Sequence, residues 1–316
     1  MRYPIIKIYN FFYSKNAFNQ YKKTNKIIWF ICNIGFRLCE IAFYYCIKLS
    51  YYLSKPFNFN DSNSEIIVSL TSFPERINDL WITVDSIMRQ SYLPKRVILY
   101  LSIDQFPKGL NSLPKSLLRY REYGLDIEFK EDDLKPHKKY FYAMQDYPKD
   151  LLVTIDDDLY YQRNALSSLI NIHKKYPEAV CANVVRVIDF NSEGEILPYS
   201  EWTSKFSLED CPSHKILAVG GGGVLYPISL FKERSMFDVN LIKENALYTD
   251  DLWLKAYELL NDISVATAEY KHLYIEIFGS QTISLKSKNV NKKIGNNDKV
   301  WSRLNDLFEI NNLLQK

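Results

Sequence analysis

Cysteine and histidine are scarce in this chain, which has five cysteines and four histidines among 316 residues. The cysteines form no Cys-x-x-Cys pair and no Cys/His spacing typical of a metal site; they are Cys32, Cys39, Cys46, Cys181 and Cys211. Their number is odd, which argues against a disulfide framework. The chain is therefore expected to belong to a reducing compartment.

Glycine is also rare, and four of the ten glycines stand together at residues 220–223. No Lys-Ser/Thr pair follows them, so they do not form a P-loop. Glycine permits unusual backbone angles and lets the backbone approach a ligand closely, so the run predicts a floor beneath a bound substrate. The alternative is a tight turn or β-bulge without a ligand.

Charge is distributed unevenly along the chain. Residues 1–60 contain nine Lys/Arg and a single acid, Glu40, whereas residues 61–316 contain more acidic than basic side chains. With 47% hydrophobic residues the chain can build a substantial core. We therefore expect a basic, aromatic segment at 1–60 and a mildly acidic folded domain at 61–316, with different partners.

Residues 27–53 have the pattern of one long amphipathic helix. Its polar members recur every three or four residues and so share one face; they are Asn33, Arg37, Glu40, Tyr44, Lys48 and Tyr51. A transmembrane helix would bury Arg37 and Glu40 near mid-span, at about 2.5–3.5 kcal/mol for each charge. A signal peptide would need a short positive start and a small-residue cleavage site, which this segment lacks.

Two interpretations of this helix remain. An in-plane helix on an anionic membrane suits the polar stripe and the preceding YKKTNK, since each Lys/Arg near such a surface contributes about 1 kcal/mol. The alternative is a helix packed on the body of the protein itself. We favour the membrane, which would place the protein in the cytoplasm, peripheral at the inner face of the cell membrane. Residues 54–65 are expected to be a linker.

From Glu65 onward, short apolar runs alternate with helical patterns. Strands are expected at 66–70, 96–103, 125–130, 151–155 and 179–185, with helices at 77–90, 112–120, 137–145 and 164–176. This alternation predicts an α/β fold with a mainly parallel sheet flanked by helices. In such sheets, ligands bind beyond the carboxyl ends of the strands.

The stretch LLVTIDDDLYY ends an apolar strand on Asp156, Asp157 and Asp158. A divalent cation prefers carboxylate oxygens and relieves the repulsion between adjacent acids, so the run predicts a site for Mn²⁺ or Mg²⁺. A cation held there would neutralise a diphosphate and help it to leave. The alternative is a solvated turn or a helix cap. The run is not the DDxxD motif of prenyl-transfer enzymes, because its last position is Tyr160.

Taken as a set, four segments resemble GT-A glycosyltransferases. They are IIVSLTSFPERINDLWITVDSIMRQSYLPKRVILYLS, TIDDDLYY, VGGGGVLYP and LYTDDLWLKAYELL. Their order is similar to the nucleotide loop, DxD motif, acceptor-side segment and ED-type acid of that family, and nearest to exostosin-type and family 2-like bacterial polysaccharide enzymes. The resemblance covers residues 65 to about 280. It implies a GT-A fold with a nucleotide-sugar-binding half at 61–160, and an acceptor half with a basic tail at 161–316.

The resemblance implies roles for the matching residues. Thr71, Phe73 and Arg76 would border the base and ribose of the donor, with Arg76 free to reach a phosphate. Further donor contacts would come from Asp104, Lys139, Asp156, Asp157, Gly222 and Gly223. The metal would be bound by Asp158 with Asp156, and His272 is a candidate third ligand. For Asp104, Lys139 and His272 the alternatives are a turn residue, a solvated lysine and a packed histidine.

Asp251 would be the general base, with Asp250 as the second choice, because in the family the second acid of the pair usually faces the acceptor hydroxyl. The alternative is that both acids cap the helix they begin. An inverting transfer needs such a base, whereas a retaining transfer, towards which the exostosin likeness points, does not. Tyr199 and Trp202 lie in a long irregular segment, where aromatic faces would stack on an acceptor sugar.

Together these inferences predict a metal-dependent glycosyltransferase. It would move a sugar from a nucleotide-diphosphate sugar, with a UDP-sugar expected, to a glycan or polyprenyl-linked acceptor in bacterial O-antigen or capsule synthesis, without a nucleic-acid partner. A nucleotidyltransferase is the alternative. Such an enzyme would need a glycine-rich basic loop after the first strand, and TSFPER has no glycine. A non-catalytic membrane scaffold would leave the clustered acids and glycines unexplained.

Overall fold

A computed structural model describes residues 6–10, 25–53, 55, 64–203, 207, 211–268, 273–280 and 296–314. Seven strands form the central sheet: β1 (Ile66–Thr71), β2 (Arg96–Ser102), β3 (Leu125–Lys130), β4 (Leu151–Thr154), β6 (Val180–Ala182), β9 (Val224–Pro227) and β10 (Val265–Ala266). Their order is β10-β6-β9-β4-β1-β2-β3. All neighbours pair in parallel except β9, which runs antiparallel to both β4 and β6. The expected mainly parallel sheet is confirmed.

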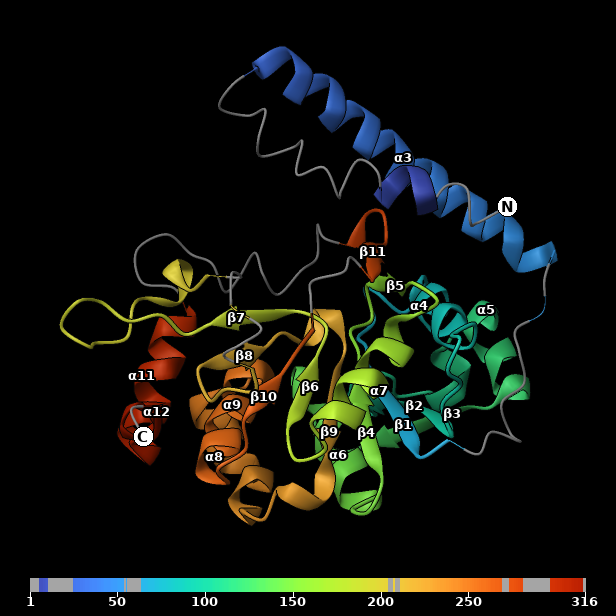
Figure 1. Cartoon of the computed structure of the whole chain (residues 1–316). Helices are drawn as coiled ribbons and strands as arrows, with labels where there is room; N and C mark the ends of the chain where they lie inside the picture. The colour runs from blue at the N-terminus through green and yellow to red at the C-terminus, as the bar shows by residue number, and fades with distance from the viewer. Residues whose placement is uncertain are drawn as a thin grey trace.

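Helices cover both faces of this sheet (Figure 1). They are α4 (Leu80–Ile87), α5 (Lys115–Leu118), α6 (Lys138–Asp146), α7 (Ala165–Lys175), α8 (Val239–Asn245), α9 (Asp250–Leu260), α11 (Asn296–Phe308) and α12 (Ile310–Leu314). Along β1, Val68 and Leu70 belong to a core cluster with α4 and α7, whereas Ile67 belongs to a second cluster with α6 and α9. Burial on both faces explains why the strands are apolar throughout.

Several elements were not predicted. Two small antiparallel sheets pair β5 (Leu159–Tyr161) with β11 (Tyr274–Glu276) and β7 (Val185–Val187) with β8 (Ile216–Ala218). The single strand expected at 179–185 is divided between β6 and β7. The C-terminal part of the chain, expected to be a basic tail, contains α11, whose Trp301 and Leu304 are buried in the cluster that contains α9.

The long helix predicted at the N-terminus is α3 (Lys26–Leu53), and it lies across one side of the body with its first turns projecting away (Figure 1). Most of its polar stripe faces the protein, although the Arg37 side chain is 66% exposed. Tyr44 donates a hydrogen bond of 2.8 Å to Asp79, and Lys48 pairs with the same carboxylate at 3.2 Å. Packing on the body, the alternative interpretation of this helix, is therefore what the structure shows for the polar face.

Apolar contacts reinforce this docking. Phe43 and Ile47 are buried in the same cluster as β1, and the ring of Phe43 packs edge-on against Tyr160 with centroids 5.0 Å apart. Near the end of α3, Tyr51 packs against Trp81 of α4 at 4.9 Å. The second half of the helix is thus part of the folded body.

The substitution Phe43→Ala should lower the free energy of unfolding by about 3–5 kcal/mol, because it leaves a cavity between α3 and β5. Leu38→Ala is the matched control, since Leu38 is 60% exposed on the outer side of the same helix, and we expect a change within about 0.5 kcal/mol. Urea unfolding of both variants measures the difference. Equal losses in the two variants would mean that α3 is not docked in this way.

Candidate active site

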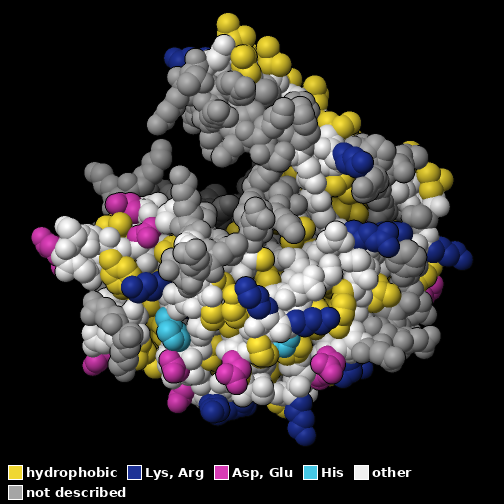
Figure 2. Space-filling model, in the orientation of Figure 1, with side chains coloured by type: hydrophobic (Ala, Val, Ile, Leu, Met, Phe, Trp, Pro, Cys, Tyr) yellow, Lys and Arg dark blue, Asp and Glu magenta, His cyan; other side chains and the backbone are white. Residues whose placement is uncertain are grey.

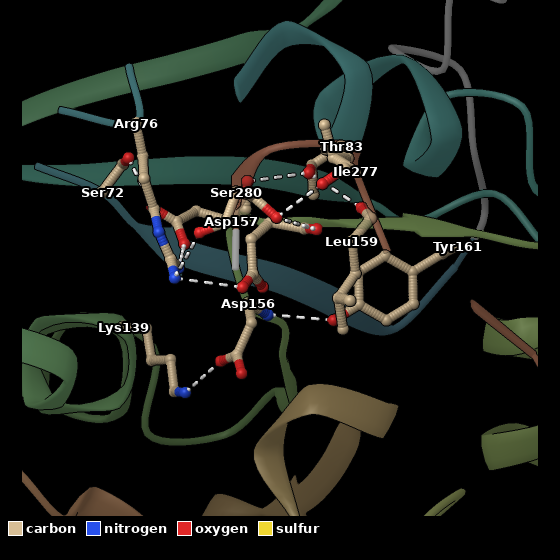
Figure 3. A network of polar contacts seen from close by, with 11 residues as sticks. Ser72, Arg76, Thr83, Lys139, Asp156, Asp157, Leu159, Tyr161, Ile277 and Ser280 are labelled. Atoms are coloured by element: carbon tan, nitrogen blue, oxygen red, sulfur yellow. Dashed lines mark hydrogen bonds and ion pairs between the residues drawn. The ribbon is translucent and has the colours of Figure 1, made fainter. Parts of the chain in front are cut away.

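The three aspartates follow β4 at the carboxyl end of the sheet, where β4 lies beside β1. The turn that carries them divides them between two buried cations (Figure 3). Asp157 Oδ1 lies 2.6 Å from Arg76 Nη1, and Asp158 Oδ2 lies 3.1 Å from Arg76 Nη2. Asp156 points the other way and accepts a hydrogen bond of 2.7 Å from Lys139 Nζ.

Asp157 is the structural member of the three. Its Oδ2 accepts a hydrogen bond of 2.6 Å from the Ser72 hydroxyl, and the Thr83 hydroxyl donates to its backbone oxygen at 3.0 Å. Its side chain is only 7% exposed, so the Arg76 pair is needed to compensate for the buried charge. The expectation that Arg76 is free to reach a phosphate is therefore wrong: both Asp157 and Asp158 engage it.

A pocket of about 370 Å³ opens beside this ion pair. Arg76, Asp157 and Asp158 form one part of its wall, and Tyr44 and Tyr45 of α3 form another. The volume falls in the range of about 300–1,000 Å³ that is usual for small-molecule sites. We did not predict that α3 borders this pocket, because the periodicity of a helix does not show which other elements it contacts.

Asp158 is the acid best suited to a divalent cation. Burial raises its pKa to about 7, helped by the negative charges of Asp157, Asp156 and Glu276, and Arg76 only partly opposes this. A cation would relieve that crowding. Within the described part of the chain no three His, Cys, Asp or Glu side chains are arranged to hold a metal. Mg²⁺, however, is usually bound by one or two carboxylates together with substrate phosphates. His272, the candidate third ligand, lies outside the described residues.

Lys139 joins the triple aspartate to the acids that begin α9. Its Nζ lies 2.7 Å from Asp156 Oδ1 and 2.9 Å from Asp250 Oδ2, and its side chain is 4% exposed. Burial alone would lower the pKa of Lys139, but Asp156, Asp250 and Asp251 hold it well above its usual 10.5. Lys139 is thus not a solvated lysine but a permanent buried cation among three carboxylates.

The two acids of α9 have different environments. Although burial opposes it, the Lys139 ammonium lowers the pKa of Asp250. Among the described residues no cation pairs directly with Asp251, whose carboxylate accepts the Gly220 N–H at 3.1 and 3.3 Å. Burial and the adjacent Asp250 raise the pKa of Asp251 to about 8. Asp251 is also the more exposed of the two, so it is the acid that a bound molecule would meet.

The glycine run explains how these acids come together. A Cβ on Gly220 would lie 2.9 Å from Asp251 Oδ1 and 3.1 Å from Lys139 Nζ, with Asp156 Oδ1 at 3.7 Å, so a side chain there would crowd the Asp251 carboxylate and the Lys139 ammonium. A Cβ on Gly221 would have more space, with its nearest neighbour, Asp156 Oδ2, 3.5 Å away. The turn is tied to the triple aspartate through Tyr161, whose hydroxyl donates to Gly221 O and accepts from Asp156 N.

The two glycines predicted as donor contacts have structural reasons to be glycine. A Cβ on Gly222 would lie 2.5 Å from Val184 Cγ2, and Gly223 has a φ of +84°, which disfavours other residues. The positions that face the acidic site are Gly220 and Gly221. Any contact from Gly222 or Gly223 to a donor would be made by the backbone.

The remaining donor candidates lie at the same edge of the sheet. Thr71 ends β1, and its buried hydroxyl has no hydrogen-bond partner within the described residues. The Arg76 guanidinium lies over the Phe73 ring at 5.3 Å. Asp104 is exposed just beyond β2. Thr71 therefore keeps an unused hydrogen-bonding group at the place where a base or ribose is predicted.

The two acceptor candidates differ in exposure. Trp202 is 4% exposed, and its ring packs against Trp301 at 5.1 Å and Tyr199 at 5.0 Å. The Trp202 ring is therefore packed in the core and is not accessible to an acceptor sugar. Tyr199 is half-buried, with the Arg186 guanidinium 4.8 Å from its ring centroid.

Sequence reasoning missed Ser72, Thr83 and Glu276. Ser72 was inside the quoted TSFPER segment and comes directly after Thr71, the last residue of β1, so its position was a usable signal. Thr83 faces the turn from inside α4 and Glu276 lies in a strand more than a hundred residues away, and no local pattern distinguishes them.

No protein-family model matches the chain, and no curated protein matches it. The chain is similar to solved structures of S. aureus TarS 1–349 in complex with UDP (17% identity, TM-score 0.43, 66% of this chain and 59% of that chain). It is similar to the mannosyltransferase PcManGT from Pyrobaculum calidifontis in complex with GDP-Man and Mn²⁺ (11%, 0.44, 87% and 80%). A third is the 4-diphosphocytidyl-2C-methyl-D-erythritolsynthase from Anaerococcus prevotii DSM 20548 (15%, 0.44, 69% and 94%).

The chain thus spans less than two thirds of the length of the TarS structure. At identities of 17% or less and TM-scores of 0.44 or less, these likenesses do not define an activity.

The substitution Lys139→Met should destabilise the protein by about 3–5 kcal/mol near neutral pH, because it leaves buried carboxylates without their cation. The folded-state pKa of Asp250 is lowered, so its contribution exists above the usual 3.8 and is lost in stronger acid. The pKa of Lys139 is raised, so its contribution exists below the usual 10.5 and is lost in stronger base. The loss should therefore be greatest between these two pH values.

Denaturant unfolding across this pH range measures the effect. Lys95→Met is the control, because the Lys95–Asp150 pair is at the surface with Lys95 50% exposed, and its loss should stay below about 1 kcal/mol. A Lys139→Met variant as stable as the wild type at neutral pH would show that the three carboxylates do not need this cation.

Proposed function

We propose that this chain is a glycosyltransferase that moves a sugar from a nucleotide-diphosphate sugar to a hydroxyl acceptor. The observation that carries the proposal is the meeting of Asp251, Lys139 and Asp156 around Gly220. It sets an acid of raised pKa beside the carboxyl end of β4, the edge at which α/β sheets bind ligands. The motif order of the GT-A family supports the same activity.

The donor would lie between β1 and the triple aspartate. Thr71 would use its hydroxyl, which has no hydrogen-bond partner among the described residues, on the base or ribose, while Arg76 stays paired with Asp157 and Asp158 and holds the pocket wall in place. Asp158 would hold Mn²⁺ or Mg²⁺, which would neutralise the departing nucleoside diphosphate. A UDP-sugar donor remains a prediction, as does a polyprenyl-linked or glycan acceptor in bacterial surface polysaccharide synthesis.

Asp251 would act as the general base. The acceptor hydroxyl would transfer its proton to the Asp251 carboxylate while the hydroxyl oxygen bonds to the anomeric carbon of the donor. The bond between that carbon and the phosphate oxygen would break at the same time, and the nucleoside diphosphate would leave. Lys139 keeps Asp250 charged, and that charge raises the proton affinity of Asp251. A base with a pKa near the working pH is the most effective, and the value of about 8 suits this role. Attack from the face opposite the diphosphate would invert the anomeric centre.

A nucleotidyltransferase is the second candidate, since it also joins an α/β sheet to carboxylate-bound metal. The loop that follows β1 contains no glycine and a single basic residue, Arg76, whose charge is engaged by Asp157 and Asp158. Such a loop offers little to the three phosphates of a nucleoside triphosphate. We therefore place this activity second.

A panel of nucleotide sugars should distinguish the two activities. With Mn²⁺, we expect a nucleoside diphosphate to be released and identified by mass spectrometry; pyrophosphate formed from a nucleoside triphosphate and a sugar phosphate would indicate nucleotidyl transfer instead.

In calorimetry, Asp158→Asn should lose Mn²⁺-dependent binding of the donor nucleotide. Asp262→Asn, at an acid that is 96% exposed, is the control and should bind as the wild type does. Unchanged binding by Asp158→Asn would remove Asp158 from the metal site.

The substitution Asp251→Asn should reduce turnover by about 10²–10⁴-fold, the usual contribution of a general base, and leave donor affinity nearly unchanged. Wild-type turnover should rise with pH towards about 8, because only the deprotonated carboxylate accepts the proton. Product anomers read by NMR report the stereochemistry. Normal turnover by Asp251→Asn, or a retained anomer, would exclude this role.

Two glycine variants provide a matched check. Gly220→Ala should push the Asp251 carboxylate aside and lower turnover in the same way, since its Cβ would lie 2.9 Å from Asp251 Oδ1. Gly221→Ala introduces only ordinary contacts, the nearest at 3.5 Å, and should stay active.

A further inference from the structure

The outer side of α3 carries a continuous uncharged stripe. Its members follow one another every three or four residues and so form one helical face; they are Ile31, Ile34, Leu38, Ala42, Tyr45, Leu49 and Tyr52. All are exposed, with Leu38 at 60%, Tyr45 at 62% and Tyr52 at 81%. Figure 2 shows hydrophobic side chains along the upper edge of this helix, away from the body. A patch of this extent on a folded protein marks an interaction surface.

The helix cannot turn to hide this stripe. Its opposite face is held by the pairing of Lys48 with Asp79, by the burial of Phe43, and by a hydrogen bond of 2.9 Å from Arg119 to the backbone oxygen of Tyr51. The same contacts argue against a spanning orientation. Although α3 is 28 residues long and apolar enough to cross a membrane by length and composition, spanning would pull its second half off the body.

We propose that this stripe is the surface by which the protein lies on an anionic lipid bilayer, with α3 in the plane of the interface. In-plane helices of this kind bury an apolar face at the boundary of headgroups and acyl chains and use flanking basic residues on anionic lipids. Arg37, whose side chain is 66% exposed, and the exposed Lys26 belong to this helix. Tyr45 and Tyr52 are residues of the type enriched at membrane interfaces.

Charge favours lipid over a second copy of the chain. Residues 1–60 contain nine Lys/Arg and one acid, so two copies meeting along α3 would bring two strongly positive segments together. An anionic bilayer attracts the same segment, at about 1 kcal/mol for each basic residue near the surface.

The membrane face adjoins the pocket. Tyr45 belongs to the outer stripe and also lines the pocket that contains Asp157 and Asp158. A bilayer beneath α3 would thus lie against the rim of that pocket. If the proposed function holds, this position suits an acceptor carried on a lipid, whereas the membrane contact itself does not depend on that function.

Flotation of the full-length chain with lipid vesicles tests the proposal. The wild type should float with vesicles of phosphatidylcholine and phosphatidylglycerol and bind less well to phosphatidylcholine alone. Leu38→Glu/Leu49→Glu, at two exposed positions of the stripe, should bind at least about tenfold less. Leu307→Glu is the control, since Leu307 is 43% exposed on α11, and it should bind as the wild type does. All three chains should keep the same circular dichroism and melting temperature.

An uncharged pair, Leu38→Gln/Leu49→Gln, separates apolar contact from repulsion and should also bind less. Wild-type chain that stays with the soluble fraction would overturn the proposal, as would normal binding by both double variants. A binding loss confined to the Glu pair would overturn the apolar contact. If light scattering shows a wild-type dimer that the double variants convert to monomers, without vesicle binding, the stripe is an interface between two copies.

Discussion

Carboxylates that are buried at the end of a central strand need nearby positive charge, and this requirement organises the rest of the site. Arg76 comes from the loop after β1 and Lys139 from α6, so each cation reaches the turn from a different side. The Arg76 pair can form only when β1 and β4 are packed together, and the Lys139–Asp156 pair only when α6 is packed beside β4. The acid motif is local in sequence, but its neutralisation is a property of the whole sheet.

The two cations also give the acids different tasks. Arg76 and Ser72 hold Asp157 in place, which leaves Asp158 at the pocket with its pKa raised. Lys139 keeps Asp250 ionised, and the charge of Asp250 then raises the pKa of Asp251. Neighbouring acids with pKa values pushed apart are a common sign of an acid–base site. The glycine turn leaves room for this arrangement, since a Cβ at Gly220 would crowd both Asp251 and Lys139.

The features that depend only on neighbouring residues in the sequence were predicted correctly. β3 was expected at 125–130 and lies there, and the acids 250 and 251 begin a helix as expected, because periodicity and caps are read within a few residues. The insertion of antiparallel β9 between β4 and β6 was not predicted, since strand order depends on contacts between distant segments. For the same reason the engagement of Arg76 and the burial of Trp202 were missed.

The orientation of α3 shows the limit most clearly. The periodicity of α3 identified a polar stripe but does not show which side faces the protein. In most surface helices the apolar side does. Here the inward side carries both kinds of residue: Glu40 is 4% exposed and pairs with Arg37 at 2.8 Å, and Phe43 and Ile47 are buried on the same side. A Leu or Ile side chain gains about 1.5–3 kcal/mol on full burial, whereas an exposed ion pair such as Lys48–Asp79 contributes about 1 kcal/mol or less. Burial of Phe43 and Ile47 therefore contributes more to this orientation than the ion pair does, and the apolar stripe left on the outer side is consistent with a surface that is covered when the protein works.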